Sequence, residues 1–180
     1  MSLKQAAERY AKTLLDLSFE QKIEERVRQD MDFVGATLEH DQLRQSMMSP
    51  IVEAATKKSI LMKLFENEVH ELSLKFLNLL IDKGREELIP EAVDAFVHQY
   101  NQRKGIQPVD LTTAADLDQS AFKELTDKIS KNYFQGKQLE IRQHVDESLV
   151  GGFILEFNNQ RIDTSVKGKL AKLLKSYSNQ

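Results

Sequence analysis

The chain has no cysteine among its 180 residues, which rules out several kinds of site at once. Disulfides, thiolate zinc sites, iron–sulfur clusters and cysteine nucleophiles are all excluded, and the lack of cysteine suits a reducing compartment. Uninterrupted apolar runs are no longer than Leu79–Ile81, whereas a membrane span needs about 20 residues. The first residues show neither a signal-peptide core nor transit character. We therefore expect the chain to meet a membrane only through a partner.

Marks of catalysis are equally scarce. Residues Gly168–Leu170 lack the upstream glycine and the hydroxyl of a phosphate loop, and no dinucleotide-binding glycine motif occurs. The four histidines are widely separated along the chain, so their spacing does not suggest a metal site. A net charge of −3 gives no strong overall field that would recruit nucleic acid. We expect no catalytic residues, no cofactor and no metal.

Glycine and proline are rare before Gly105, which favours long helices. Apolar residues recur there at helical spacing in six segments. Ser49 and Pro50 predict the N-cap and first residue of the fourth of them. Together they indicate a six-helix bundle over residues 1–104. The expected helices cover residues 3–17, 23–38, 42–47, 50–64, 69–83 and 90–100.

The pattern changes after Gly105 to a mixture of strands and helices. Residues 106–113 are rich in Val, Ile and Thr and contain Pro108, which predicts an edge strand. The pattern then predicts a helix over 117–133 and strands over 139–145 and 153–157. These are followed by a turn at Asn158–Asn159, a second hairpin arm at 161–162 and a final amphipathic helix. The fold class is therefore α+β, predominantly α, with a small α/β domain over 105–180.

The fifth expected helix is apolar around much of its circumference. Leu72, Phe76, Leu77 and Leu80 form one stripe, which further leucines and Ile81 widen. Such a helix is either central in a bundle or presents a second face to a partner.

The last helix has a row of lysines: Lys167, Lys169, Lys172 and Lys175. Cations near a helix C-terminus are favoured by the helix dipole, but the row also suits an acidic partner, with nucleic acid as a third alternative. Gly151 and Gly152 precede a strand, which indicates a bulge or a close backbone approach. Asp163, Thr164 or Ser165 is expected to cap the last helix.

Several of these segments together resemble a known family. Residues 145–155 (VDESLVGGFIL) and 161–170 (RIDTSVKGKL) resemble the C-terminal signature of F-type ATP synthase delta subunits, the family of the mitochondrial oligomycin sensitivity-conferring protein. Residues 10–15, 76–85 and 100–106 are similar to its first helix, fifth helix and domain junction. The chain departs from the family at Asn158–Asn159 and at Thr164, where glycine is common; asparagine tolerates the left-handed conformation that such a turn needs.

The resemblance implies a mechanical function. Such a stator subunit is not an enzyme, binds no nucleotide or cofactor, and resists rotor torque during proton-driven ATP synthesis. It joins the catalytic head to the membrane-anchored b-subunit stalk on the cytoplasmic face of a bacterial inner membrane. The helical domain would receive N-terminal helices of the alpha subunits between its first and fifth helices, and the C-terminal domain would meet the stalk. A helical adaptor unrelated to the motor and an enzyme with an unfamiliar site are the alternatives.

The resemblance also indicates which residues would make these contacts. Gly151, Gly152 and Asp163 are expected to be structural, and the four lysines of the last helix are expected to meet the stalk, together with the hairpin before it. The candidates for the alpha-subunit helix are Tyr10, Leu14, Leu17, Leu72, Phe76 and Leu79.

Overall fold

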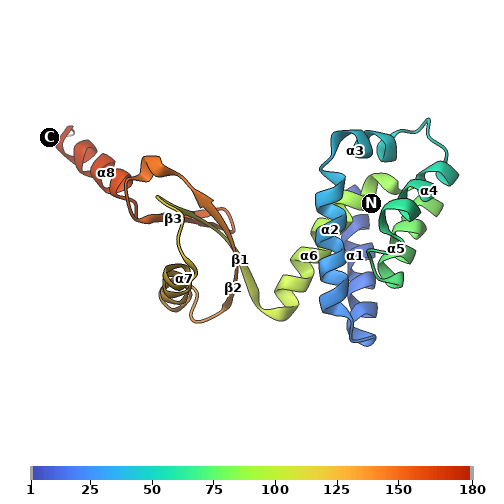
Figure 1. Cartoon of the computed structure of the whole chain (residues 1–180), viewed down its shortest axis with the longest axis horizontal. Helices are drawn as coiled ribbons and strands as arrows, with labels where there is room; N and C mark the ends of the chain where they lie inside the picture. The colour runs from blue at the N-terminus through green and yellow to red at the C-terminus, as the bar shows by residue number, and fades with distance from the viewer. Residues whose placement is uncertain (1, 179–180) are drawn as a thin grey trace. The chain divides into compact units, whose positions relative to one another are not determined.

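The computed structural model describes residues 2–178 and is predominantly helical, with one small four-stranded sheet (Figure 1). It forms two compact units, which divide between Tyr100 and Asn101. The sequence places the boundary a few residues later, after Lys104, where the helix across this division ends. Fold class is thus α+β, as expected.

The N-terminal unit contains helices only, and their apolar stripes form its core. Each long helix buries aliphatic or aromatic side chains, among them Leu15, Met31, Phe65, Leu80 and Phe96. The packing of the six helices as a bundle stays a prediction. The elements are α1 (Leu3–Glu20), α2 (Glu24–Leu38), α3 (Asp41–Met48), α4 (Ala54–Phe65), α5 (Glu71–Asp82), the 3-10 turn η1 (Glu86–Leu88) and α6 (Ile89–Lys104).

The start of α4 differs from the prediction. The helix begins at Ala54, after an irregular stretch that includes Pro50. The Ser49 hydroxyl accepts a hydrogen bond from the Ile51 N–H at 3.3 Å, so the serine stabilises a local turn. The N-cap prediction at Ser49 and Pro50 was therefore wrong.

A buried carboxylate fixes the start of α5 against α2. Asp30 accepts hydrogen bonds from the His70 N–H at 2.8 Å and from the Ser73 hydroxyl at 2.6 Å. It also pairs with Arg26 at 3.0 Å. A buried carboxylate with several donors is satisfied and strongly positioned, so the face that α5 presents is set by this network.

The C-terminal unit is a sheet with two helices. The order is β2-β1-β3-β4, with β1 parallel to β2 and antiparallel to β3. Asn158 and Asn159 both have positive φ, which confirms the predicted β3–β4 hairpin turn. The elements are β1 (Ile106–Thr113), α7 (Gln119–Tyr133), β2 (Gln138–Val145), η2 (Glu147–Leu149), β3 (Phe153–Phe157), β4 (Gln160–Asp163) and α8 (Val166–Ser178).

Strand β1 is central in the sheet, so the edge position predicted from Pro108 was wrong. The register explains how the proline is accommodated. Strand β3 pairs with β1 only over Asp110–Thr113, so Pro108 lies beyond that ladder and has a strand on one side only.

The two faces of the sheet differ in chemistry. Helix α7 covers one face, where Val109, Leu111 and Leu155 pack with Ile129 and Phe134. Strand alternation puts Asp110, Arg142 and Glu156 on the opposite face, where Arg142 pairs with Asp110 at 3.0 Å. Helix α7 thus packs on the apolar core of the sheet, whereas the apolar side chains of α8 are exposed.

Candidate partner-binding surfaces

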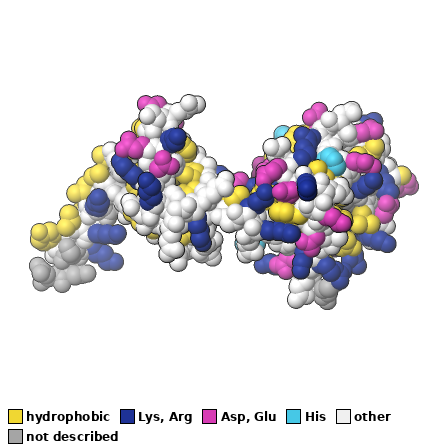
Figure 2. All heavy atoms as spheres, turned by 90° about the horizontal axis from the view of Figure 1, so that it is seen from below, with side chains coloured by type: hydrophobic (Ala, Val, Ile, Leu, Met, Phe, Trp, Pro, Cys, Tyr) yellow, Lys and Arg dark blue, Asp and Glu magenta, His cyan; other side chains and the backbone are white. Residues whose placement is uncertain are grey.

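Helix α8 exposes its apolar stripe. The five stripe residues, 40–76% exposed, lie on one side of the helix because they follow helical spacing. Figure 2 shows this row along the helix at the left end of the view, with lysines on the other side. An apolar row of this size is typical of an interaction surface. The stripe consists of Val166, Leu170, Leu173, Leu174 and Tyr177.

The lysines surround this stripe. At about 100° per residue, Lys167 and Lys169 flank it on its two sides, and Lys172 and Lys175 lie on the opposite face. All four are exposed, and Lys167 also donates to the Ser148 hydroxyl at 3.0 Å. The predicted basic face is present, and the apolar stripe of the predicted amphipathic helix is exposed as well, which the sequence did not predict.

A tight corner holds the start of α8 against β3. The N–H of Val166 donates to the Gly151 carbonyl at 3.0 Å. Thr164 donates from its own N–H to the Phe153 carbonyl at 3.0 Å, and its hydroxyl donates to the same oxygen at 2.8 Å. These bonds fix the direction in which α8 leaves the sheet.

Gly152 makes this corner possible. Its φ is +76°, and a Cβ there would lie 2.6 Å from the Thr164 carbonyl oxygen. That separation is far below van der Waals contact, so only glycine fits both the conformation and the space. The close backbone approach predicted for the glycine pair is confirmed at this residue.

Asp163 and Ser165 form the cap of α8. Ser165 is buried, and its hydroxyl accepts from the Gly168 N–H at 2.9 Å, which makes it the N-cap. Asp163 accepts from the Ser165 hydroxyl at 2.6 Å and from its N–H at 2.9 Å. The hydroxyl and the N–H hold the pKa of the Asp163 carboxyl below its usual value. A Cβ at Gly168 would lie 2.7 Å from both Asp163 oxygens, so that glycine leaves room for the carboxylate.

Helices α1 and α5 pack together, as expected. The six candidate residues on them fall into three groups by exposure. Leu17 and Leu79 are exposed, whereas Tyr10 and Leu72 are half-buried. Leu14 and Phe76 are 2% and 7% exposed. Both side chains are therefore part of the core in the isolated chain, and their contact with an alpha-subunit helix stays a prediction.

Tyr10 links the two helices. Its hydroxyl accepts a hydrogen bond from Arg85, just after α5, at 3.1 Å. The Arg85 guanidinium also lies 5.7 Å from the centroid of the Tyr10 ring, within cation–π range. Leu3, Tyr10 and Leu17 recur every seven residues, and so do Leu72 and Leu79, so each helix has an exposed or half-buried apolar row.

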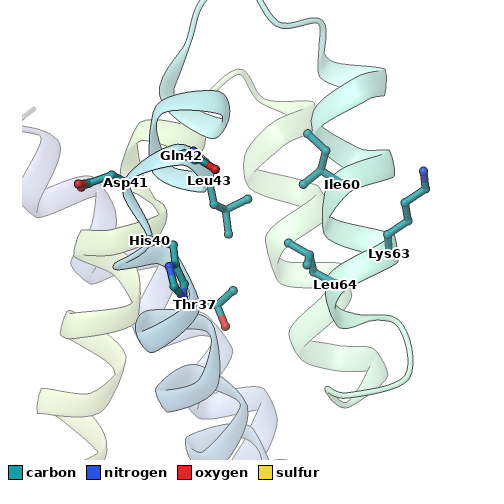
Figure 3. Close-up of a pocket in the computed structure, with 8 residues that line it drawn as sticks. All are labelled: Thr37, His40, Asp41, Gln42, Leu43, Ile60, Lys63 and Leu64. Carbon is teal, nitrogen blue, oxygen red and sulfur yellow. The ribbon is translucent and has the colours of Figure 1, made fainter.

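A further cleft lies among α2, α3 and α4, with a volume of about 690 Å³. Leu43, Ile60 and Leu64 project into it, whereas Asp41 and Lys63 point away (Figure 3). The Thr37 hydroxyl is already bonded to the Phe33 carbonyl at 2.7 Å. The geometry provides no nucleophile–base pair of the kind that acyl-transfer chemistry requires.

The described part of the chain, residues 2–178, contains neither a cluster of metal-binding side chains nor a membrane-spanning helix. No three His, Asp or Glu side chains in this range gather as they would around a metal ion. None of the helices there is both long and apolar enough to span a bilayer.

Uncovered apolar helix surfaces in both units define a protein that acts by binding other proteins. Comparison with known proteins identifies the family to which the chain belongs. The family model described as ATP synthase delta (OSCP) subunit matches residues 6–176. The chain therefore belongs to the ATP synthase delta (OSCP) subunit family, which confirms the resemblance. It is a non-catalytic subunit of the ATP synthase peripheral stalk.

Individual relatives agree over nearly the whole chain. Identity is 36% to ATP synthase subunit delta of Cytophaga hutchinsonii, over 97% of this chain and 94% of the relative. It is 32% to the subunit of Amoebophilus asiaticus, over 97% and 95%. A chain in the Toxoplasma gondii mitochondrial ATP synthase hexamer has a TM-score of 0.70 at 22% identity, covering 95% of this chain and 96% of that one, which shows a shared fold.

Proposed function

We propose that the protein links the catalytic head of an F-type ATP synthase to the membrane-anchored b-subunit stalk. It would resist rotor torque from the cytoplasmic face of a bacterial inner membrane. The observation that carries this proposal is the exposed stripe of α8, which a corner of hydrogen bonds holds in a defined direction. A rigidly held apolar helix is suited to transmit force to a partner that covers it.

The N-terminal unit, as a six-helix bundle, would bind the head through α1 and α5. The exposed Leu17 and Leu79 and the half-buried Tyr10 and Leu72 are the contacts for an amphipathic N-terminal helix of an alpha subunit. Leu14 and Phe76 support this surface from below. Tyrosine suits the rim because its ring offers apolar area while its hydroxyl stays bonded to Arg85.

The C-terminal unit would bind the stalk through α8. The apolar stripe supplies the buried area, and the lysines beside it attract acidic stalk residues. Exposed charge pairs contribute little net affinity, so the lysines mainly set association rate and register. The apolar stripe is therefore added to the stalk contact expected from the sequence, which consists of the four lysines and the hairpin before the last helix.

Two double variants of the purified chain test the proposal. Leu17→Glu with Leu79→Glu should lose co-purification with the catalytic head and keep the stalk. Leu170→Glu with Leu174→Glu should lose the stalk and keep the head. Lys123→Glu with Lys131→Glu, on exposed positions of α7, is the control and should keep both. Retention of both partners by the first two variants would reject the proposal.

A further inference from the structure

Positive charge in the C-terminal unit is concentrated on α8. The unit has twelve Lys and Arg against ten Asp and Glu, and four of the twelve are in α8, which has no acidic residue. The rest of the unit is therefore net negative. The net charge of the whole chain is small, but α8 is strongly basic and also has the exposed apolar stripe.

The stripe is wider than one partner helix covers. Val166, Leu170, Leu173 and Tyr177 follow the alternating four- and three-residue spacing of a two-helix seam. Leu174 lies beside that seam on the Lys167 side, and its side chain is 71% exposed. A flat apolar surface would contact all five stripe residues, including Leu174. A single partner helix packed along the seam would leave Leu174 at the edge of the interface.

We propose that, in the chain free of its complex, α8 lies on the surface of an anionic lipid bilayer. Its stripe would enter the boundary between headgroups and acyl chains. Lys167 and Lys169, at the two edges of the stripe, extend their aliphatic stems along it and place their ammonium groups among the phosphates. Lys172 and Lys175, on the far side of the helix, add long-range attraction.

Charge nearby limits the strength of this contact. Helix α8 packs against η2, which contains Glu147 and is capped by Asp146, and Asp163 lies just before the start of α8. The net attraction at that end is therefore smaller than four lysines alone give, and binding should be reversible and sensitive to salt. The inference uses the α8 face that the proposed function gives to the stalk, so stalk and bilayer should compete. The sequence-based expectation that the chain meets a membrane only through a partner then applies to the assembled enzyme.

Vesicle flotation of the full chain tests the proposal. Vesicles of phosphatidylglycerol with phosphatidylethanolamine should bind the chain, and vesicles of phosphatidylcholine should bind it much more weakly. Because each lysine near the surface contributes roughly fivefold in affinity, K167Q/K169Q/K172Q/K175Q should weaken binding by roughly a hundredfold or more. K4Q/K12Q/K123Q/K131Q, with the same loss of charge elsewhere on exposed positions, should bind nearly as the parent does.

A tryptophan gives a second readout, because the chain has none. Tyr177→Trp should show blue-shifted emission with the anionic vesicles, and adding L170E/L174E should abolish the shift while circular dichroism stays unchanged. The soluble part of the stalk should release the chain from vesicles. Equal binding by both lysine variants, binding independent of lipid charge, or self-association of the chain through α8 would overturn the inference. Stalk capture without vesicle binding would overturn it and leave the proposed function intact.

Discussion

Gly152 and Thr164 approach so closely that no side chain fits between them: a Cβ on Gly152 would lie 2.6 Å from the Thr164 carbonyl oxygen. This contact joins the start of β3 to the segment before α8. The direction of α8, and with it the stalk-binding surface that we propose, depends on a single glycine.

Gly152→Ala should destabilise the C-terminal unit by about 2–5 kcal/mol, from a positive-φ penalty of about 1–2 kcal/mol and overpacking of about 1–3 kcal/mol. Gly136→Ala is the matched control, because Gly136 has φ +79° but open space around it. It should cost only the backbone penalty. Denaturant unfolding measures both, and equal losses would show that the contact with Thr164 contributes nothing.

The carboxylate of Asp163 should make the cap of α8 sensitive to acid. Its pKa is lowered in the folded chain by the Ser165 hydroxyl and N–H. Its stabilising contribution is therefore complete above the ordinary carboxyl pKa of about 3.9 and disappears as pH falls through the lower folded value. Amide exchange at Ser165 and Gly168 should quicken in that range. Carboxyl titration by NMR checks this directly, and an ordinary pKa for Asp163 would contradict it.

Leu14 and Leu17 lie on the same helix, yet should respond differently to truncation. Leu14→Ala should cost about 2–5 kcal/mol, because it leaves a cavity in the core. Leu17→Ala should cost about 1 kcal/mol or less, since its side chain is 38% exposed. Binding to the head should show the reverse order once stability is allowed for. Comparable unfolding midpoints for the two variants would contradict the assignment of Leu14 to the core.

Lys57 and Glu86 form a largely buried ion pair that joins α4 to η1. Loss of the lysine leaves the carboxylate without its cation, so Lys57→Met should destabilise the N-terminal unit by about 1–3 kcal/mol, discounted because Glu86 keeps some contact with water. Adding Glu86→Leu should restore much of that loss. A double-mutant cycle in thermal unfolding measures the coupling, and additive losses would show that the pair is not coupled.

The sequence predicted the element types well, because each helix and strand has a clear apolar period. It could not predict where α4 begins, since Ser49 and Pro50 suit a turn as well as a helix start. Spacing alone also could not separate Leu14 from Leu17, because both belong to the apolar face of α1 and only packing shows which is covered.

The exposure of the α8 stripe could not be predicted for a related reason. Val166 and Leu170 fit any amphipathic helix, and the usual partner of such a helix is its own domain. The missing information was that the apolar core of the sheet packs with α7, while the stripe of α8 stays exposed. The alternation of Asp110, Arg142 and Glu156 with apolar residues already indicated a polar second face.

Thiol accessibility tests the central claim most directly, because the chain has no cysteine of its own. Single variants Leu17→Cys, Leu79→Cys and Leu174→Cys should react quickly with a maleimide in the isolated chain. In the assembled ATP synthase all three should be protected, whereas Asp127→Cys, on an exposed position of α7, should react as before. If the three thiols in the assembled enzyme react as fast as the control, these surfaces do not bind the head and the stalk.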